Sequence, residues 1–83
     1  MEVWLSSEAA KQLDELSEPI HARMLKIIVR LSSWPHVSGA KPLRGKLSGH
    51  FRMRTGDYRL QFTVHEGGVL IEKIGHRDRF YEE

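Results

Sequence analysis

The residues best suited to chemistry are basic side chains concentrated in the middle of the chain. Between Lys41 and Arg59 the sequence holds six lysines and arginines against a single acidic residue, Asp57, although the whole 83-residue chain has a formal net charge of only +2. Such a local excess predicts an anion-binding surface. Arginine suits a phosphate, because its guanidinium binds two oxygens at once. The plain alternative is a solvated basic edge.

The spacing of these residues predicts that several of them share one face of a β-hairpin. His50, Arg52 and Arg54 alternate with large apolar residues, and after a tight turn Arg59 and Gln61 do the same. Pleating and hairpin pairing place such residues side by side on one face. Because like charges directly across a hairpin destabilise it, this arrangement favours a bound anion that neutralises them.

A second group of reactive side chains follows the last expected strand. It consists of His76, Arg77, Arg79 and Tyr81. An imidazole exchanges protons near neutral pH, and cationic neighbours favour the phenolate form of a tyrosine. Tyr81 and His76 are therefore alternative candidates for proton transfer. Packing of the Tyr81 ring and a structural role for His76 are the plain alternatives.

Other chemistries lack their sequence signatures. There is no GxxxxGK[ST] or GxGxxG phosphate-binding loop. The five histidines are scattered without the spacing of a zinc-binding helix, and there is no cysteine. Acidic residues do not cluster as a two-metal nuclease requires. We therefore expect neither a metal nor a cofactor.

The elements that position these groups follow from the spacing of apolar residues and from turn-forming residues. Serines near residues 6–7 and at residue 17 are expected to cap two helices. The sequence predicts, in order, a strand over residues 1–5, a helix over about 7–16, a helix over about 20–31, a loop over 36–49, a hairpin over 50–64, a strand over 69–74 ended by Gly75, and a polar tail over 76–83.

These elements predict one α+β domain over residues 1–83. Its order is β-α-α-β-β-β: an N-terminal strand, a two-helix antiparallel hairpin and a three-stranded antiparallel meander. The helices should cover the apolar face of the sheet, since neither layer buries its apolar side alone. The cationic face is then left open. The pattern does not decide which face Glu72 and Lys73 take.

The composition also bears on where the protein works. The absence of cysteine fits a reducing compartment. No apolar run approaches the roughly 20 residues of a membrane span. The first residues lack the basic start and apolar stretch of a signal peptide. We expect a cytoplasmic protein that does not interact with membranes.

Two stretches of this chain in combination carry a family resemblance. The segment PLRGKLSGHFRMRTGDYRL at residues 42–60 is followed by IGHRDRFY at residues 74–81. The pair of patterns RxRxGDYR on a hairpin and IGHRxxxY shortly after it resembles the RelE-type toxins of bacterial type II toxin–antitoxin modules. The resemblance extends over nearly the whole chain, because the strand–helix–helix start also matches. The chain is identified as a member of the RelE/ParE toxin superfamily.

The resemblance implies an endoribonuclease, an mRNA interferase, that cleaves mRNA without a metal, usually on the ribosome. In such toxins the 2′-hydroxyl of a nucleotide attacks the adjacent phosphate. It also implies a cognate antitoxin as partner, with oligomers formed through the antitoxin. The resemblance implies two catalytic arginines, Arg59 and Arg77. It also implies that Tyr81 lies near the attacking hydroxyl and that His76 has a supporting catalytic role. The implied RNA- and phosphate-binding residues are Arg52, Arg54, Lys46, Arg44 and Arg79.

Two other functions remain open at this point. The ParE branch of the superfamily has a similar fold but inhibits DNA gyrase by binding, without cleaving anything. A nucleic-acid-binding module would use the same cationic face without turnover, and its affinity would fall steeply with salt. The sequence departs from its relatives in one respect that concerns catalysis: no carboxylate–histidine pair is evident in it.

Overall fold

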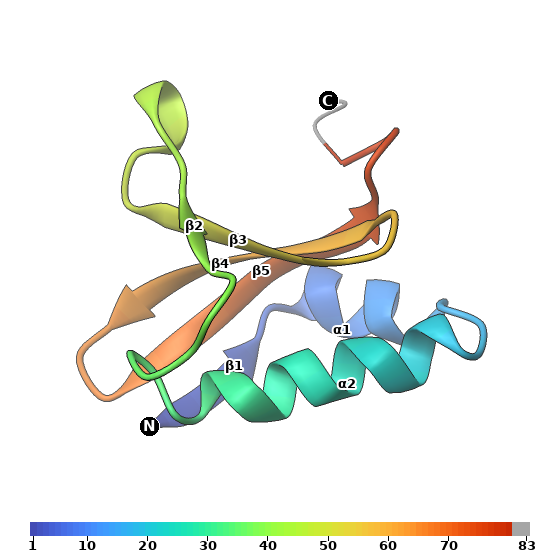
Figure 1. The fold of residues 1–83 in the computed structure, drawn as a ribbon, viewed down its shortest axis with the longest axis horizontal. Coiled ribbons are helices and arrows are strands. Elements are labelled where there is room, and N and C mark those ends of the chain that lie inside the picture. Colours follow the sequence, from blue (N-terminus) through green and yellow to red (C-terminus); the bar gives the residue numbers. More distant parts are fainter. Residues whose placement is uncertain (81–83) are drawn as a thin grey trace.

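The computed structural model describes residues 1–80 and arranges them in two layers, a pair of helices against one face of a five-stranded sheet (Figure 1). The helices are α1 (Ser7–Asp14) and α2 (Ile20–Leu31), and a short 3-10 helix spans Gly45–Leu47. The strands are β1 (Glu2–Leu5), β2 (Lys41–Pro42), β3 (His50–Thr55), β4 (Tyr58–His65) and β5 (Gly68–His76).

The strands lie in the order β1-β5-β4-β3-β2. Strands β3, β4 and β5 form the antiparallel meander, and β2 extends it antiparallel to β3. Strand β1 pairs with β5 in parallel, so the sheet is mixed. The predicted α+β fold and its order of elements are confirmed.

The strands differ from the sequence prediction at two points. Residues 36–49, predicted as a loop, contain β2, where Lys41 pairs with Arg52 and Pro42 with Phe51. Proline is tolerated there because β2 is an edge strand. The last strand does not end at Gly75 but continues to His76, because it keeps pairing with β4 up to the hairpin turn.

The two helices begin in different ways. Ser6 caps α1 as predicted, and its hydroxyl accepts the N–H of Ala9 at 3.0 Å. Helix α2 has no side-chain cap, contrary to the role predicted for Ser17. Ser17 contributes its backbone carbonyl instead, which accepts the N–H of His21 at 3.1 Å. A backbone turn thus takes the place of the side-chain cap.

The hydrophobic core lies between the helices and the sheet. Its most buried members include Met24 and Leu31 of α2 and Leu60 and Phe62 of β4. The ring of Phe62 stacks on Phe51 at a centroid distance of 5.4 Å, and the Trp34 ring meets both edge-on at 5.0 and 5.4 Å. This aromatic cluster supports the hairpin from below, so the opposite face of the sheet rests on a packed layer.

A β-bulge interrupts the pairing of β4 with β5. Gln61 pairs with Lys73 and Phe62 pairs with Ile71, so Glu72 is an extra residue in β5. Bulges bend a strand and redirect its side chains. The bulge explains the spacing of the buried apolar side chains of β5, which are Val69, Ile71 and Ile74. The first two are two residues apart, and the last two are three residues apart.

Candidate functional site

The face of the sheet opposite the helices carries the predicted cationic hairpin. Arg54 lies directly across from Arg59, and Arg52 lies across from Gln61. His50 is the next residue on the same face of β3, as predicted from the alternation. We call this surface, formed by His50, Arg52, Arg54, Arg59 and Gln61, the cationic face.

The arginines of the cationic face have no counter-ion among residues 1–80. Within residues 1–80, Arg52, Arg54 and Arg59 make no ion pair within 4.0 Å. The Nη1 atom of Arg59 is fully buried and has no hydrogen-bond partner there. A buried donor without a partner costs about 1–3 kcal/mol.

The nearby acidic side chains are engaged elsewhere. Asp57, in the hairpin turn, lies 3.7 Å from Nε of Arg77, and Glu72 lies 2.7 Å from Nδ1 of His50. Neither is paired with an arginine of the cationic face. Arg54 and Arg59 therefore have no acidic partner within residues 1–80.

The remaining predicted RNA-binding residues lie around this face. Arg44 and Lys46 are exposed on the connection between β2 and β3. Figure 1 shows this connection and the C-terminal segment, down to residue 80, both on the side of the sheet away from the helices. The two segments therefore flank the cationic face. Arg79 is exposed on the C-terminal segment.

The C-terminal segment is tied to the hairpin turn. The backbone N–H of Arg77 donates to the carbonyl of Asp57 at 2.7 Å. The Arg77 guanidinium is half exposed, with Nε 3.7 Å from Asp57 and 3.6 Å from Asp78. Phe80 is buried, and a Cβ atom added at Gly75 would lie 3.7 Å from its ring. Gly75 pairs with Arg59, so the glycine leaves room beside that arginine.

His76 does not share the cationic face. It pairs with Tyr58, two residues along from the buried Leu60–Ile74 pair, and so points to the same side of the sheet as that pair, the helix side. Its ring meets that of Tyr58 edge-on at 5.1 Å. Its Nδ1 accepts the N–H of Asp78 at 3.1 Å and lies 3.6 Å from the Asp78 carboxylate. Tyr81 lies outside the described residues.

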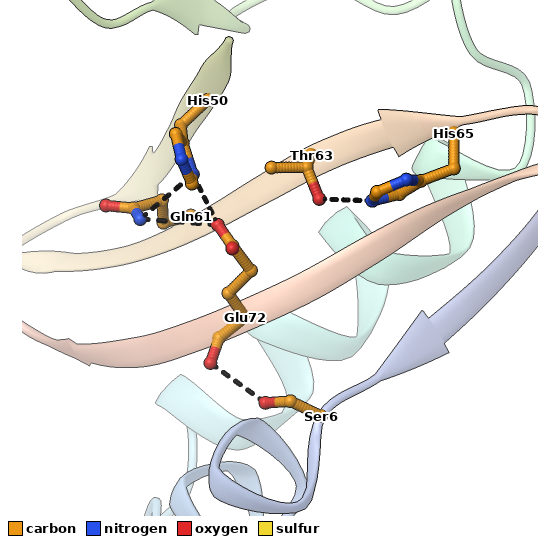
Figure 2. Close-up of polar contacts among 6 residues, drawn as sticks. All are labelled: Ser6, His50, Gln61, Thr63, His65 and Glu72. Carbon is orange, nitrogen blue, oxygen red and sulfur yellow. Dashed lines mark hydrogen bonds and ion pairs between the residues drawn. The ribbon is translucent and has the colours of Figure 1, made fainter. Parts of the chain in front are cut away.

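The structure also contains the carboxylate–histidine pair that was not evident in the sequence (Figure 2). His50 Nδ1 lies 2.7 Å from Glu72 Oε1, and the Gln61 amide donates to the same oxygen at 3.3 Å. The bulge turns Glu72 onto the cationic face. A sequence signal for it exists: strict alternation after Val69 and Ile71 would bury residue 73, whereas the next apolar residue is Ile74.

Two further features of residues 1–80 complete the description. They contain no group of three or more His, Cys, Asp or Glu side chains placed to hold a metal ion. None of the helices in this part of the chain has the length and apolar character needed to cross a membrane.

Comparisons with known proteins give the family. A family model described as the ParE toxin of the type II toxin–antitoxin system, parDE, matches residues 3–81. Toxin RelE from Mycobacterium tuberculosis (strain ATCC 25618 / H37Rv) is 36% identical over 73 residues, which are 87% of this chain and 74% of that protein.

Solved structures agree with this assignment. A chain of the RelBE2 toxin–antitoxin complex from Mycobacterium tuberculosis superposes with a TM-score of 0.77 at 30% identity, covering 90% of this chain and 95% of that one. The isolated RelE toxin from E. coli superposes with a TM-score of 0.76 at 20% identity, covering 95% and 86%, a likeness of fold alone. The chain belongs to the RelE/ParE superfamily of toxins from type II toxin–antitoxin systems.

Proposed function

We propose that this toxin is an endoribonuclease that cleaves mRNA on the ribosome without a metal ion. The observation that carries the proposal is the Arg54–Arg59 pair, which faces across the hairpin and has no ion-pair partner within residues 1–80. Preorganised donors of this kind stabilise charge that develops on a phosphate during reaction. Such stabilisation, together with positioning, can replace a metal in the attack of a 2′-hydroxyl on its own 3′ phosphate.

In this proposal the basic residues have two roles, binding the reacting phosphate and binding the neighbouring phosphates of the message. Arg52, Arg54 and Arg59 hold the reacting phosphate, and Arg77 joins them from the segment anchored at Asp57. The exposed residues at the rim bind neighbouring phosphates of the message: Arg44, Lys46 and Arg79. The reaction needs one group to take the proton from the hydroxyl and another to protonate the leaving oxygen. Tyr81 and His76 are the candidates from the family resemblance.

The similarity to RelE toxins favours RNA cleavage over inhibition of DNA gyrase. Two of the chain's relatives, at 36% and 30% identity, are a RelE toxin and a chain of the RelBE2 toxin–antitoxin complex. We propose in addition that a cognate antitoxin binds this chain, as RelB does in that complex. A cluster of arginines without counter-ions offers an acidic segment of the antitoxin an electrostatic target, and oligomers would form through the antitoxin.

Purified protein incubated with translating ribosomes and a defined message should create new RNA ends. Attack by the 2′-hydroxyl predicts fragments with 2′,3′-cyclic phosphate and 5′-hydroxyl ends, which end-specific ligation distinguishes from 5′-phosphates. Cleavage should persist when magnesium is replaced by cobalt hexammine, which keeps ribosomes assembled but offers no inner-sphere site. Fragments with 5′-phosphate ends, or cleavage restored only by magnesium, would contradict the mechanism. Binding without any cleavage would favour the nucleic-acid-binding alternative.

The two proton-transfer candidates can be separated by substitution. Tyr81→Phe keeps the ring and removes only the hydroxyl, so a chemical role predicts a loss of at least about tenfold in the single-turnover rate with RNA binding unchanged. His76→Ala should lose less, because His76 lies on the helix side of the sheet. Rapid-quench cleavage assays measure both rates. Near wild-type cleavage by Tyr81→Phe, together with an inactive His76→Ala, would show that His76 rather than Tyr81 transfers the proton.

A further inference from the structure

A polar network extends the cationic face toward the start of β3. It consists of His50, Gln61 and Glu72, one residue from each of β3, β4 and β5, as Figure 2 shows. His50 is two residues from Arg52 on the same strand face, which places their Cα atoms about 7 Å apart. Gln61 lies directly across from Arg52 and also contacts the network. The network and the phosphate-binding arginines thus form one continuous surface.

The contacts determine where the histidine carries its proton. At 2.7 Å, Nδ1 of His50 and Oε1 of Glu72 must share a hydrogen, since two lone pairs would repel each other. A carboxylate is the weaker base, so the proton rests on Nδ1. The Gln61 amide adds a second donor to the same oxygen at 3.3 Å. In the neutral ring the lone pair is then on Nε2, which makes no hydrogen bond within residues 1–80.

Glu72 is held in place from behind. Its backbone carbonyl accepts a hydrogen bond from the Ser6 hydroxyl at 2.9 Å, and the neighbouring carbonyl of Ile71 accepts the Ser6 N–H at the same distance. Ser6 is fixed in turn as the cap of α1. Together with the bulge, these bonds anchor the carboxylate that orients His50. The His50 and Glu72 side chains are 26% and 29% exposed, so the ring is accessible to a ligand but is not free to rotate in solvent.

The other candidate histidine has the opposite arrangement. Nδ1 of His76 accepts a backbone N–H, so a neutral His76 carries its proton on Nε2 and exposes a donor. His50 exposes an acceptor on the cationic face. Of the two, only His50 combines a free imidazole lone pair with adjacency to the arginines.

We propose that His50 is the general base of the RNA cleavage reaction and that Glu72 is its positioning residue. Nε2 of His50 takes the proton of the 2′-hydroxyl, and the 2′-oxygen bonds to phosphorus. The bond from phosphorus to the 5′-oxygen breaks, and that oxygen leaves with the electron pair and takes a proton from a donor in the site or from water. The products are a 2′,3′-cyclic phosphate and a 5′-hydroxyl, and Glu72 stabilises the imidazolium.

The decisive variant is His50→Gln. A glutamine amide still donates to Glu72 but cannot accept the proton, so the fold and RNA binding should be retained. The single-turnover rate should fall about 100-fold, near the lower end of general-base effects. Glu72→Gln should lose less, about tenfold. His65→Ala is the matched control and should cleave normally, because within residues 1–80 the His65 ring hydrogen-bonds the Thr63 hydroxyl and makes no hydrogen bond to His50, Gln61 or Glu72.

A second measurement is independent of cleavage. The ring nitrogen chemical shifts of His50 should report a proton on Nδ1 in the wild type and a loss of this preference in Glu72→Gln. Wild-type rates in His50→Gln, or a proton on Nε2 in the wild-type ring, would overturn this inference and leave the proposed function intact. Since the inference rests on that function, a wild-type protein that cleaves no RNA would remove both. If His50→Gln unfolds, the nitrogen shifts decide the question.

Discussion

Arg59→Ala should lower the single-turnover rate of RNA cleavage by about 10²–10³-fold, or about 3–4 kcal/mol of transition-state stabilisation. The substitution removes the guanidinium whose buried Nη1 has no partner in residues 1–80 and which lies across from Arg54. Stability should be unchanged or slightly higher, because a buried unsatisfied donor and a like-charge contact disappear together. Rapid-quench kinetics and thermal unfolding measure the two effects.

Two further variants sharpen this test. Arg59→Lys keeps the charge but loses the planar two-pronged donor, so its rate should lie between those of wild type and Arg59→Ala. Arg23→Ala removes an exposed arginine from α2, on the helix side of the molecule, and should leave cleavage unchanged. An Arg59→Ala protein that is unfolded at 25 °C would show that Arg59 has a structural role.

Phe62→Ala should destabilise the domain by about 3–5 kcal/mol, the usual cost of removing a fully buried phenylalanine. Phe62 has no exposed surface and contacts both Phe51 and Trp34. Because domains of this kind are stable by only about 5–15 kcal/mol, the loss should unfold a measurable fraction of the protein. Urea unfolding followed by tryptophan fluorescence gives the free energy directly.

Val29→Ala is the matched control for this stability prediction. Val29 is 70% exposed on α2, so its truncation should change the free energy of unfolding by no more than about 0.5 kcal/mol. Equal losses for Phe62→Ala and Val29→Ala would mean that the aromatic cluster is not the core of the domain.

The parts of the fold that were predictable are those with regular apolar spacing. The alternation on either side of the turn gave β3 and β4 their faces, and the helical spacing of Met24, Ile27 and Leu31 placed α2 on the core. Both follow from local geometry, in which side chains repeat every two or 3.6 residues. The cationic face was predictable for the same reason, since Arg52, Arg54 and Arg59 obey the strand period.

The parts that were missed depend on contacts between distant segments. The local apolar spacing indicates a bulge near Glu72, but it does not show that Glu72 meets His50, because that contact depends on how β5 pairs with β4 and β4 with β3. The side taken by His76 follows from its pairing with Tyr58, which requires the strand to run past Gly75. Strand β2 exists only because residues 41–42 lie against β3. Single-sequence patterns carry little information on such pairings.

The parallel pairing of β1 with β5 also determines when a newly made chain can become toxic. Residues 2–5 are synthesised first but have no sheet partner until residues 68–71 have been added. Strand β5 also supplies Glu72 and the glycine beside Arg59. A nascent chain that lacks β5 therefore holds its arginines on a hairpin that has not yet joined a complete sheet. The proposed RNase site is thus assembled only when nearly all of the domain has been synthesised.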